Sequence, residues 1–279
     1  MAAHVGTAQT SRPRTMVIPR EHGAWGMLLV PLATGAAVGA HSTVHLGALI
    51  LFVVAAVSLF WLRTPVESWL GTSPIKAQTK GERGFVLRTI LSISAVSVTS
   101  VVVLLWMGNR QLLLLGALAA GAFALQALVK TAGRNGRMPA QMIGAIGLTS
   151  TVAGAYYVAS GHLDRMALAL WLANWLFAVD QIHFVQLRIH TSRAATLDEK
   201  LKKGLPFLLL QISLIGVVLV ACRFALLPAA SAVAFLPVLA RGTYWFIRGR
   251  QPLDVHRLGF AELAHSIAFG VLLCGSLLF

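Results

Sequence analysis

Three places in the chain set a carboxylic acid close to a histidine inside or beside a long apolar segment. The candidate catalytic residues are Glu21, His22, Asp180, His183, Glu262 and His265. In two of the three pairs the histidine follows three residues after the acid, so both side chains share one face of a helix. Ionisable side chains inside a membrane are costly, and each is therefore a candidate functional residue. The chemistry indicated is general base catalysis, in which Asp180 or Glu262 polarises its histidine.

Two other interpretations of these pairs stay open. In the first, each carboxylate holds its own histidine or a nearby arginine and closes a polar rim at the membrane surface. In the second, the acid-x-x-His spacing resembles the pattern that binds two metal ions inside helical bundles. That pattern needs further glutamates from two more helices, and only Glu21 and Glu67 are available. We assign no metal, and the gathering of acids and histidines at one predicted depth favours a polar cavity that opens to the cytoplasm.

Basic residues after the apolar segments are suited to clamping an anionic head group such as a phosphate, a carboxylate or a diphosphate. Together with one acid, the candidate substrate-binding residues are Arg63, Glu67, Lys76, Lys80, Arg188 and Arg193. Ordinary membrane topology and attraction to anionic lipid would also place basic residues in these loops. The sequence leaves both explanations open.

The elements that must position these residues are predicted to be transmembrane helices. Of the 279 residues, 57% are hydrophobic and 11% charged, whereas soluble domains average about 25% charged. Apolar runs of the length that crosses a bilayer indicate nine helices. Their approximate spans are 22–40, 44–62, 86–107, 111–129, 139–160, 166–187, 205–222, 226–247 and 260–279. We predict an all-α polytopic bundle, with residues 21–279 as one transmembrane domain and residues 1–20 as a disordered cytoplasmic tail.

The distribution of positive charge predicts the orientation of this bundle. Twenty of the 23 Lys and Arg residues, Lys200 and Arg241 among them, are assigned to the tail and to loops on one side of the membrane. The other side has only Arg110, Arg165 and Arg223. The positive-inside rule then places the N-terminus in the cytoplasm and the C-terminus outside. Because topology explains the net charge of +14, we expect no nucleic-acid partner. We expect contact with membrane lipid, in a multi-pass protein of the bacterial inner membrane.

Small residues and prolines add local expectations. Gly35 and Gly39 form a GxxxG step, which indicates close packing of one helix on another. Pro237 falls inside the span 226–247 and is expected to kink it. Pro206 lies near the start of its predicted helix, where proline costs no hydrogen bond.

Several motifs resemble one family of bacterial membrane proteins. The segment at residues 19–27, Pro-Arg-Glu-His-Gly-Ala-Trp-Gly-Met, with Pro31 following it, resembles the start of the YwiC-like family. The Arg-Thr-Pro step at residues 63–65, the Leu-Arg-Ile stretch at 187–189 and the segment 259–265 are similar too. The resemblance spans nearly the whole chain. It implies an integral membrane protein and no particular reaction.

A more distant similarity is architectural. UbiA-type intramembrane prenyltransferases also have nine helices, an inside N-terminus and a cytoplasm-facing cavity. Their two aspartate-rich motifs, after helices 2 and 6, hold magnesium against an isoprenyl diphosphate. The corresponding places here offer one carboxylate, Glu67, and then Asp180 followed by Arg188. The similarity implies a UbiA-like arrangement of the helices. Our hypothesis for the anion is that Arg63, Arg188 and Arg193 hold it directly, in place of magnesium.

The function expected from these patterns is binding of an anionic amphipathic substrate in a cytoplasm-facing polar cavity. The protein would be a divergent UbiA-like transferase or a non-catalytic binder. Transport of a small solute or proton, and an accessory role in a membrane complex, stay open as alternatives. A transport path needs polar residues in the outer half of the membrane, where the candidates are few: Thr149, Ser150, Thr151 and Asn174. The sequence identifies no cofactor.

Overall fold

Helices account for all regular secondary structure in the described part of the chain. The computed structural model describes residues 15–18, 22–41, 45–72, 75–133, 136–191, 196–248 and 253–279, apart from the side chains of His22 and Leu197. Eight helical spans within these ranges are long and apolar enough to cross a membrane, and a ninth helix is apolar but shorter. The predicted all-α polytopic bundle of about nine helices is confirmed. Its orientation and its UbiA-like arrangement stay predictions.

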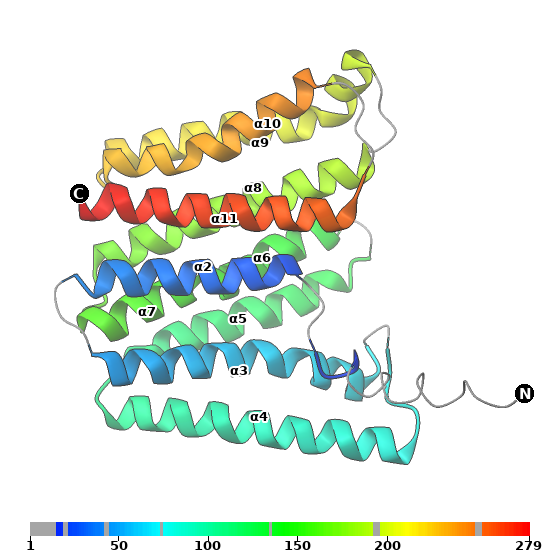
Figure 1. Cartoon of the computed structure of the whole chain (residues 1–279), viewed down its shortest axis with the longest axis vertical. Helices are drawn as coiled ribbons and strands as arrows, with labels where there is room; N and C mark the ends of the chain where they lie inside the picture. The colour runs from blue at the N-terminus through cyan, green and yellow to red at the C-terminus, as the bar shows by residue number, and fades with distance from the viewer. Residues whose placement is uncertain are drawn as a thin grey trace, which may run out of the picture. The chain divides into compact units, whose positions relative to one another are not determined.

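The helices follow one another along the chain with short connections (Figure 1). Their bounds are α2 (His22–Gly39), α3 (Leu46–Leu70), α4 (Lys80–Trp106), α5 (Leu112–Lys130), α6 (Arg137–Thr149), α7 (Thr151–Ser160), α8 (Arg165–His190), α9 (Leu197–Arg223), the 3-10 helix η1 (Ala229–Phe235), α10 (Leu236–Ile247) and α11 (Val255–Leu278). Two of the predicted spans each divide into two elements. The span 139–160 becomes α6 and α7, and the span 226–247 becomes η1 and α10.

Several helices continue beyond the apolar runs that predicted them, and polar caps mark where they begin. The Thr79 side chain accepts a hydrogen bond from the Glu82 amide, and the Glu82 carboxylate accepts one from the Thr79 amide, which begins α4. Asp254 caps α11 by accepting from the amides of His256 and Arg257. The hydrogen bond from the Arg257 amide lowers the pKa of the exposed Asp254 carboxyl. Hydropathy detects only the apolar part of a helix, so these polar first turns are missed.

The predictions made for two prolines, Pro206 and Pro237, compare differently with the structure. Pro206 lies well inside α9, so the prediction that it stands near a helix start is wrong. The error arose because the polar turns before it, which begin at residue 197, are helical as well. Pro237 stands in the first turn of α10, directly after the 3-10 turns of η1. The span 226–247 therefore changes helix type just before Pro237, and the kink expected there stays a prediction.

The described residues fall into two compact units. Unit 1 comprises residues 1–22 and 46–110, and in it α3 and α4 pack side by side as a helical hairpin (Figure 1). Residues 15–18, from the stretch predicted as a tail, pack on this hairpin. Ser68 Oγ donates to the Met16 carbonyl at 2.9 Å, and Trp61 Nε1 donates to the Val17 carbonyl at 2.6 Å. Residues 1–14, 19 and 20 lie outside the described ranges, and the tail at 1–20 and the single domain at 21–279 stay predictions.

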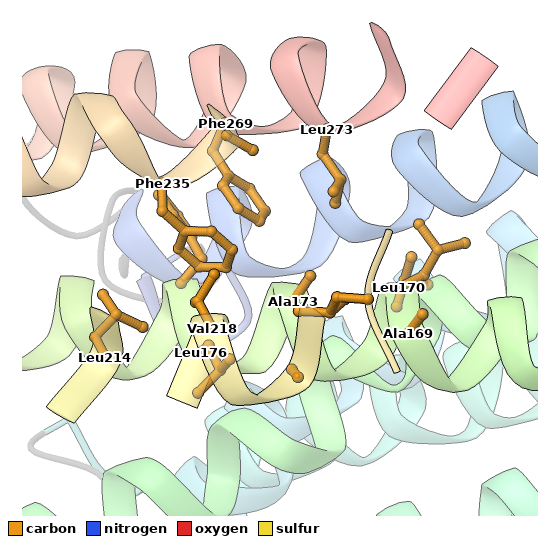
Figure 2. Close-up of a cluster of buried hydrophobic side chains, with 14 of the residues drawn as sticks. Ala169, Leu170, Ala173, Leu176, Leu214, Val218, Phe235, Phe269 and Leu273 are labelled. Carbon is orange, nitrogen blue, oxygen red and sulfur yellow. The ribbon is translucent and has the colours of Figure 1, made fainter. Parts of the chain in front are cut away.

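Unit 2 comprises residues 23–45 and 111–279, and more than half of the α8 side chains are buried in it. Side chains of α8, α9, η1 and α11 meet in the largest apolar cluster of this unit, shown in Figure 2. The Phe269 ring stacks on Phe177 with 4.3 Å between centroids and lies 5.3 Å from the Phe235 ring, edge to face. Aromatic pairs of this geometry add about 0.5–1.5 kcal/mol beyond the area they bury. This cluster fixes the faces that α8 and α11 present to each other.

The glycine step of α2 meets α7 at close range. A Cβ atom at Gly35 would lie 2.1 Å from the Val152 carbonyl oxygen, and one at Gly39 would lie 2.8 Å from the Tyr156 oxygen. Only the absence of a side chain allows the two backbones to approach in this way. The close packing predicted from the GxxxG spacing is confirmed.

Candidate functional site

Three charged side chains from three helices of unit 2 meet in its interior. Arg241 of α10 donates through Nη2 to Asp180 Oδ2 of α8 at 2.5 Å, and through Nη1 to Glu262 Oε2 of α11. The side chains of Arg241, Asp180 and Glu262 are 7%, 0% and 3% exposed. The guanidinium also lies 4.1 Å from the centre of the Phe184 ring. One arginine therefore bridges the two acids that the sequence singled out.

Polar uncharged side chains complete this arrangement. Gln211 Nε2, from α9, donates to Asp180 Oδ1. Gln181 Nε2 donates to the Glu262 carbonyl and to Ser266 Oγ, each at 3.1 Å. All of these residues are buried. We refer to the set as the polar layer: Asp180, Gln181, Gln211, Arg241, Glu262 and Ser266.

Apolar residues cover the polar layer on both sides, one helical turn away. On the α8 side Phe177 belongs to the cluster of Figure 2, and Phe184 belongs to a second cluster with Leu187, Phe207, Trp245 and Phe246. The same order recurs on the neighbouring helices, in the sets Leu214–Gln211–Phe207, Val238–Arg241–Trp245 and Phe269–Ser266–Glu262–Leu258. Residues three to four apart lie on one helix face. The layer is thus a polar slab between two apolar slabs, with little access for water.

Three buried polar atoms of this layer have no hydrogen-bond partner among the described residues. They are Gln181 Oε1, Arg241 Nε and Glu262 Oε1. Buried polar groups are nearly always hydrogen-bonded, so each exception calls for an explanation. The three atoms comprise one donor and two acceptors. Glu262 thus offers one carboxylate oxygen that is not committed to Arg241.

The two candidate histidines of unit 2, His183 and His265, contact the backbones of their own helices. His183 Nδ1 lies 2.8 Å from the Val179 carbonyl, and His265 Nδ1 lies 2.7 Å from the Ala261 carbonyl. Each ring is half-buried and is held by the backbone of its own helix. A carbonyl is only an acceptor, so Nδ1 carries the proton and Nε2 faces away as an acceptor in the neutral ring. The carboxylates bond to Arg241, a nearby arginine being the other partner that the sequence left open.

Basic side chains gather where α8 and α10 end and α9 begins. Arg188 occupies the last turn of α8, half-buried, and lies within electrostatic range of Arg248 and of Glu262. Lys200, which is buried, donates to the Trp245 carbonyl at 3.0 Å and to the Arg248 carbonyl. Lys200 also lies within electrostatic range of Arg188. We refer to Arg188, Lys200 and Arg248 as the basic end of unit 2.

Four of the sequence candidates belong to unit 1. Arg63 Nε donates to Glu67 Oε1 at 2.9 Å within α3, and both side chains are partly exposed. Lys76 and Lys80 are exposed, in the connection after α3 and at the start of α4. The substrate-binding role of these four residues stays a prediction.

Two candidates lie outside the described residues. Glu21 and Arg193 fall in the ranges 19–21 and 192–195, and His22 is described only as the first residue of α2. Within the described ranges, the acids, histidines and cysteines form no group of three or more that could hold a metal ion.

Lys200 and Arg241 correct the charge assignment made from the sequence. Both were assigned to cytoplasmic loops, but Arg241 lies inside α10 and Lys200 lies inside α9, and both are buried against hydrogen-bond acceptors. The signal was present in the sequence, because Arg241 falls within the predicted span 226–247. An arginine there requires an internal partner. Gln181 and Gln211 gave no comparable signal, because a glutamine in an apolar helix carries no charge that needs compensation.

Comparison with known proteins gives one match. Residues 18–157 match the family model described as YwiC-like protein. The match covers half of the chain and ends in α7, before the helices that carry the polar layer. No curated protein matches the chain, and no solved structure matches it.

Proposed function

The chain belongs to the YwiC-like family, and from that premise we propose that it binds the anionic head group of an amphipathic molecule at the basic end of unit 2. The protein is a multi-pass helical membrane protein. We assign it to the bacterial inner membrane, with the basic end facing the cytoplasm. The observation that carries the proposal is the gathering of Arg188, Lys200 and Arg248 at the ends of three adjacent helices.

Charge at this end supports an anionic ligand. Arg188 lies within electrostatic range of two other cations and of one acid, Glu262, so these four groups carry a net positive charge that attracts an anion. Lys200 is already committed to two backbone carbonyls at the end of α10, where a cation also stabilises the helix dipole. We assign the ligand to Arg188 and Arg248, the two guanidinium groups that lie within electrostatic range of each other. Arginine suits this role because its planar guanidinium binds phosphate oxygens in pairs.

The surroundings of the basic end support an apolar tail on the same ligand. Ile189, Leu201 and Leu205 are exposed on α8 and α9 within two turns of Arg188 or Lys200. In a bilayer these side chains face lipid tails. A molecule with an anionic head and an apolar chain would therefore bind the basic residues with its head and pack on these apolar side chains with its chain. Lipid head groups and isoprenyl diphosphates share this chemistry.

A transferase role would add a proton acceptor near the bound head group. Glu262 has an oxygen, Oε1, that Arg241 does not occupy, and its charge acts on Arg188. Asp180 has both oxygens engaged by donors. If the protein is a divergent UbiA-like transferase, Glu262 would exchange a proton with the bound substrate through Oε1, acting as a base only when that oxygen is deprotonated. The histidines His183 and His265 would act through Nε2.

Thermal unfolding of the purified protein in detergent tests the proposal. Saturating isoprenyl diphosphate should raise the midpoint by roughly 5 °C, because a ligand at a hundred times its Kd adds about 2.7 kcal/mol to the folded state. The shift should survive chelation of magnesium and disappear in Arg188→Ala. Lys202→Ala is the matched control, because Lys202 is exposed at the same end and pairs with Asp198.

Parallel samples identify the source of the anion. A shift with phosphatidylglycerol alone would assign the site to membrane lipid, and a shift with inorganic diphosphate alone would remove the need for a tail. No shift with any of the three, or an equal shift in Arg188→Ala, would contradict the proposal.

Transport of a proton or small solute is the second candidate function. The observation that favours it is the polar layer, which puts two acids and an arginine inside membrane-spanning helices. Charged residues at such positions commonly mark ion or proton pathways. Proton uptake by the protein in sealed vesicles, measured with an entrapped pH indicator, would favour this function over binding.

A further inference from the structure

The polar layer has an unbalanced charge if both of its acids are ionised. Asp180 and Glu262 share one buried cation, Arg241. Arg188, which also lies within electrostatic range of Glu262, is half-buried in the last turn of α8 and is not part of the layer. Apolar slabs on either side keep water and its counterions away. A net charge in such surroundings is strongly disfavoured, whereas one bound proton makes the three groups neutral together.

Hydrogen-bond donors show which acid carries that proton. Asp180 accepts from Gln211 on Oδ1 and from Arg241 on Oδ2, so a proton on either oxygen would face an N–H group. Glu262 accepts from Arg241 on Oε2, and Oε1 has no partner within the described ranges. Of the carboxyl oxygens of Asp180 and Glu262, Glu262 Oε1 is therefore the one where an added proton would not face an N–H group.

An acceptor for the new O–H lies on the neighbouring helix. Gln181 Nε2 already bonds to the Glu262 carbonyl and to Ser266, which holds the Gln181 amide beside Glu262. Gln181 Oε1 is buried and lacks a donor in the described residues. A proton on Glu262 Oε1 would supply a donor to Gln181 Oε1. The two atoms would bond directly or through a bridging water that also accepts from Arg241 Nε.

We propose that the polar layer is a proton-binding site in which Glu262 is protonated on Oε1 and Asp180 is the ionised partner of Arg241. Arg188 of α8 also lies within electrostatic range of Glu262. Gln211 of α9 and Ser266 of α11 are uncharged. The rings of His183 and His265 bond to their own helix backbones. The proposal does not depend on the anion site, so the two fail independently.

Amide substitutions separate the two acids. Glu262→Gln replaces a protonated acid by a group of the same shape with a donor at the same place, so the midpoint of thermal unfolding should stay within about 2 °C of wild type. Asp180→Asn leaves only one oxygen for two donors, and its midpoint should fall by roughly 5 °C or more. Glu67→Gln is the control, because Glu67 is a partly exposed acid in unit 1.

Infrared spectroscopy of the full-length protein at neutral pH gives a second readout. The chain has only nine acidic residues, so the carbonyl stretch of a buried carboxylic acid is assignable by single substitutions. Wild type and Glu67→Gln should show this band, and Glu262→Gln should lack it. Absence of the band from wild type would overturn the proposal even if Asp180→Asn does not fold. Loss of the band in Asp180→Asn with retention in Glu262→Gln would assign the proton to Asp180 and overturn it as well.

Discussion

Lys200 and Arg241 are both buried cations, and they donate to different kinds of hydrogen-bond acceptor. Arg241 donates to carboxyl groups on two other helices, whereas Lys200 donates to backbone carbonyls at the end of α10 and lies 5.0 Å from the Trp245 ring centre. The carbonyls of the last helical turn have no partner within their own helix. Lys200 therefore links the start of α9 to the end of α10 and orders the basic end.

Replacing Lys200 by methionine should show what this link contributes. The variant keeps the apolar stem but leaves the Trp245 and Arg248 carbonyls without a donor, which should cost about 1.5–3 kcal/mol of unfolding free energy. Chemical denaturation in a mixed detergent system gives this difference. Lys202→Met should change stability by less than about 0.5 kcal/mol, because its partner Asp198 is 73% exposed. Equal losses of unfolding free energy in Lys200→Met and Lys202→Met would show that only the charge of Lys200 contributes to stability, and that its buried hydrogen bonds do not.

Residue types alone were enough to select Asp180 and Glu262, because an acid in an apolar helix always requires an explanation. The partners of these acids were not predictable in the same way. Gln181 and Gln211 reach them only because α8, α9 and α11 pack in one particular register, which the sequence does not display. The assignment of the histidines as partners of the acids rested on spacing along one helix, and the rings bond to their own backbone instead.

At the scale of the helix, small residues set how closely elements approach. Gly35 and Gly39 bring α2 against the backbone of α7, while Gly116 of α5 has no neighbour within 4 Å of a Cβ position. The two helices therefore contain glycines with opposite structural roles. The GxxxG spacing distinguishes them in the sequence.

Alanine substitution at these glycines should have effects of opposite sign. Gly35→Ala should destabilise the protein by about 1–3 kcal/mol, because the new methyl group meets a backbone oxygen that has no free rotation. Gly116→Ala should be neutral or stabilising by up to about 1 kcal/mol, because alanine is the better helix former. Thermal unfolding of both variants checks the signs. A neutral Gly35→Ala would show that α2 is not held against α7.

Helix bounds were predictable in their apolar parts and not at their polar ends. Windows of hydropathy located all nine segments, but the first turns of α4, α9 and α11 are charged and are held by caps at Thr79, Thr196 and Asp254. The change from η1 to α10 before Pro237 also escaped prediction. Such local features depend on side-chain hydrogen bonds that a hydropathy window averages out.

At the scale of the whole molecule, charge and hydropathy together predict a membrane protein, and the eight long apolar helices agree. The distribution of Lys and Arg predicts in addition which side is cytoplasmic. Two of the counted residues, Lys200 and Arg241, are buried inside helices. Removing these two from the count leaves the asymmetry large, so the prediction of an inside N-terminus is unchanged.

Labelling of single cysteines at the two ends of α9 tests the topology on which the proposed cytoplasmic site depends. In a background with Cys222 and Cys274 replaced by serine, one variant carries Lys202→Cys and the other Phe224→Cys. Both positions are exposed, at opposite ends of the helix. A membrane-impermeant thiol reagent added to intact cells should label the cysteine at position 224 and reach position 202 only after permeabilisation. Labelling of position 202 from outside, or of both positions from the same side, would contradict a basic end that faces the cytoplasm.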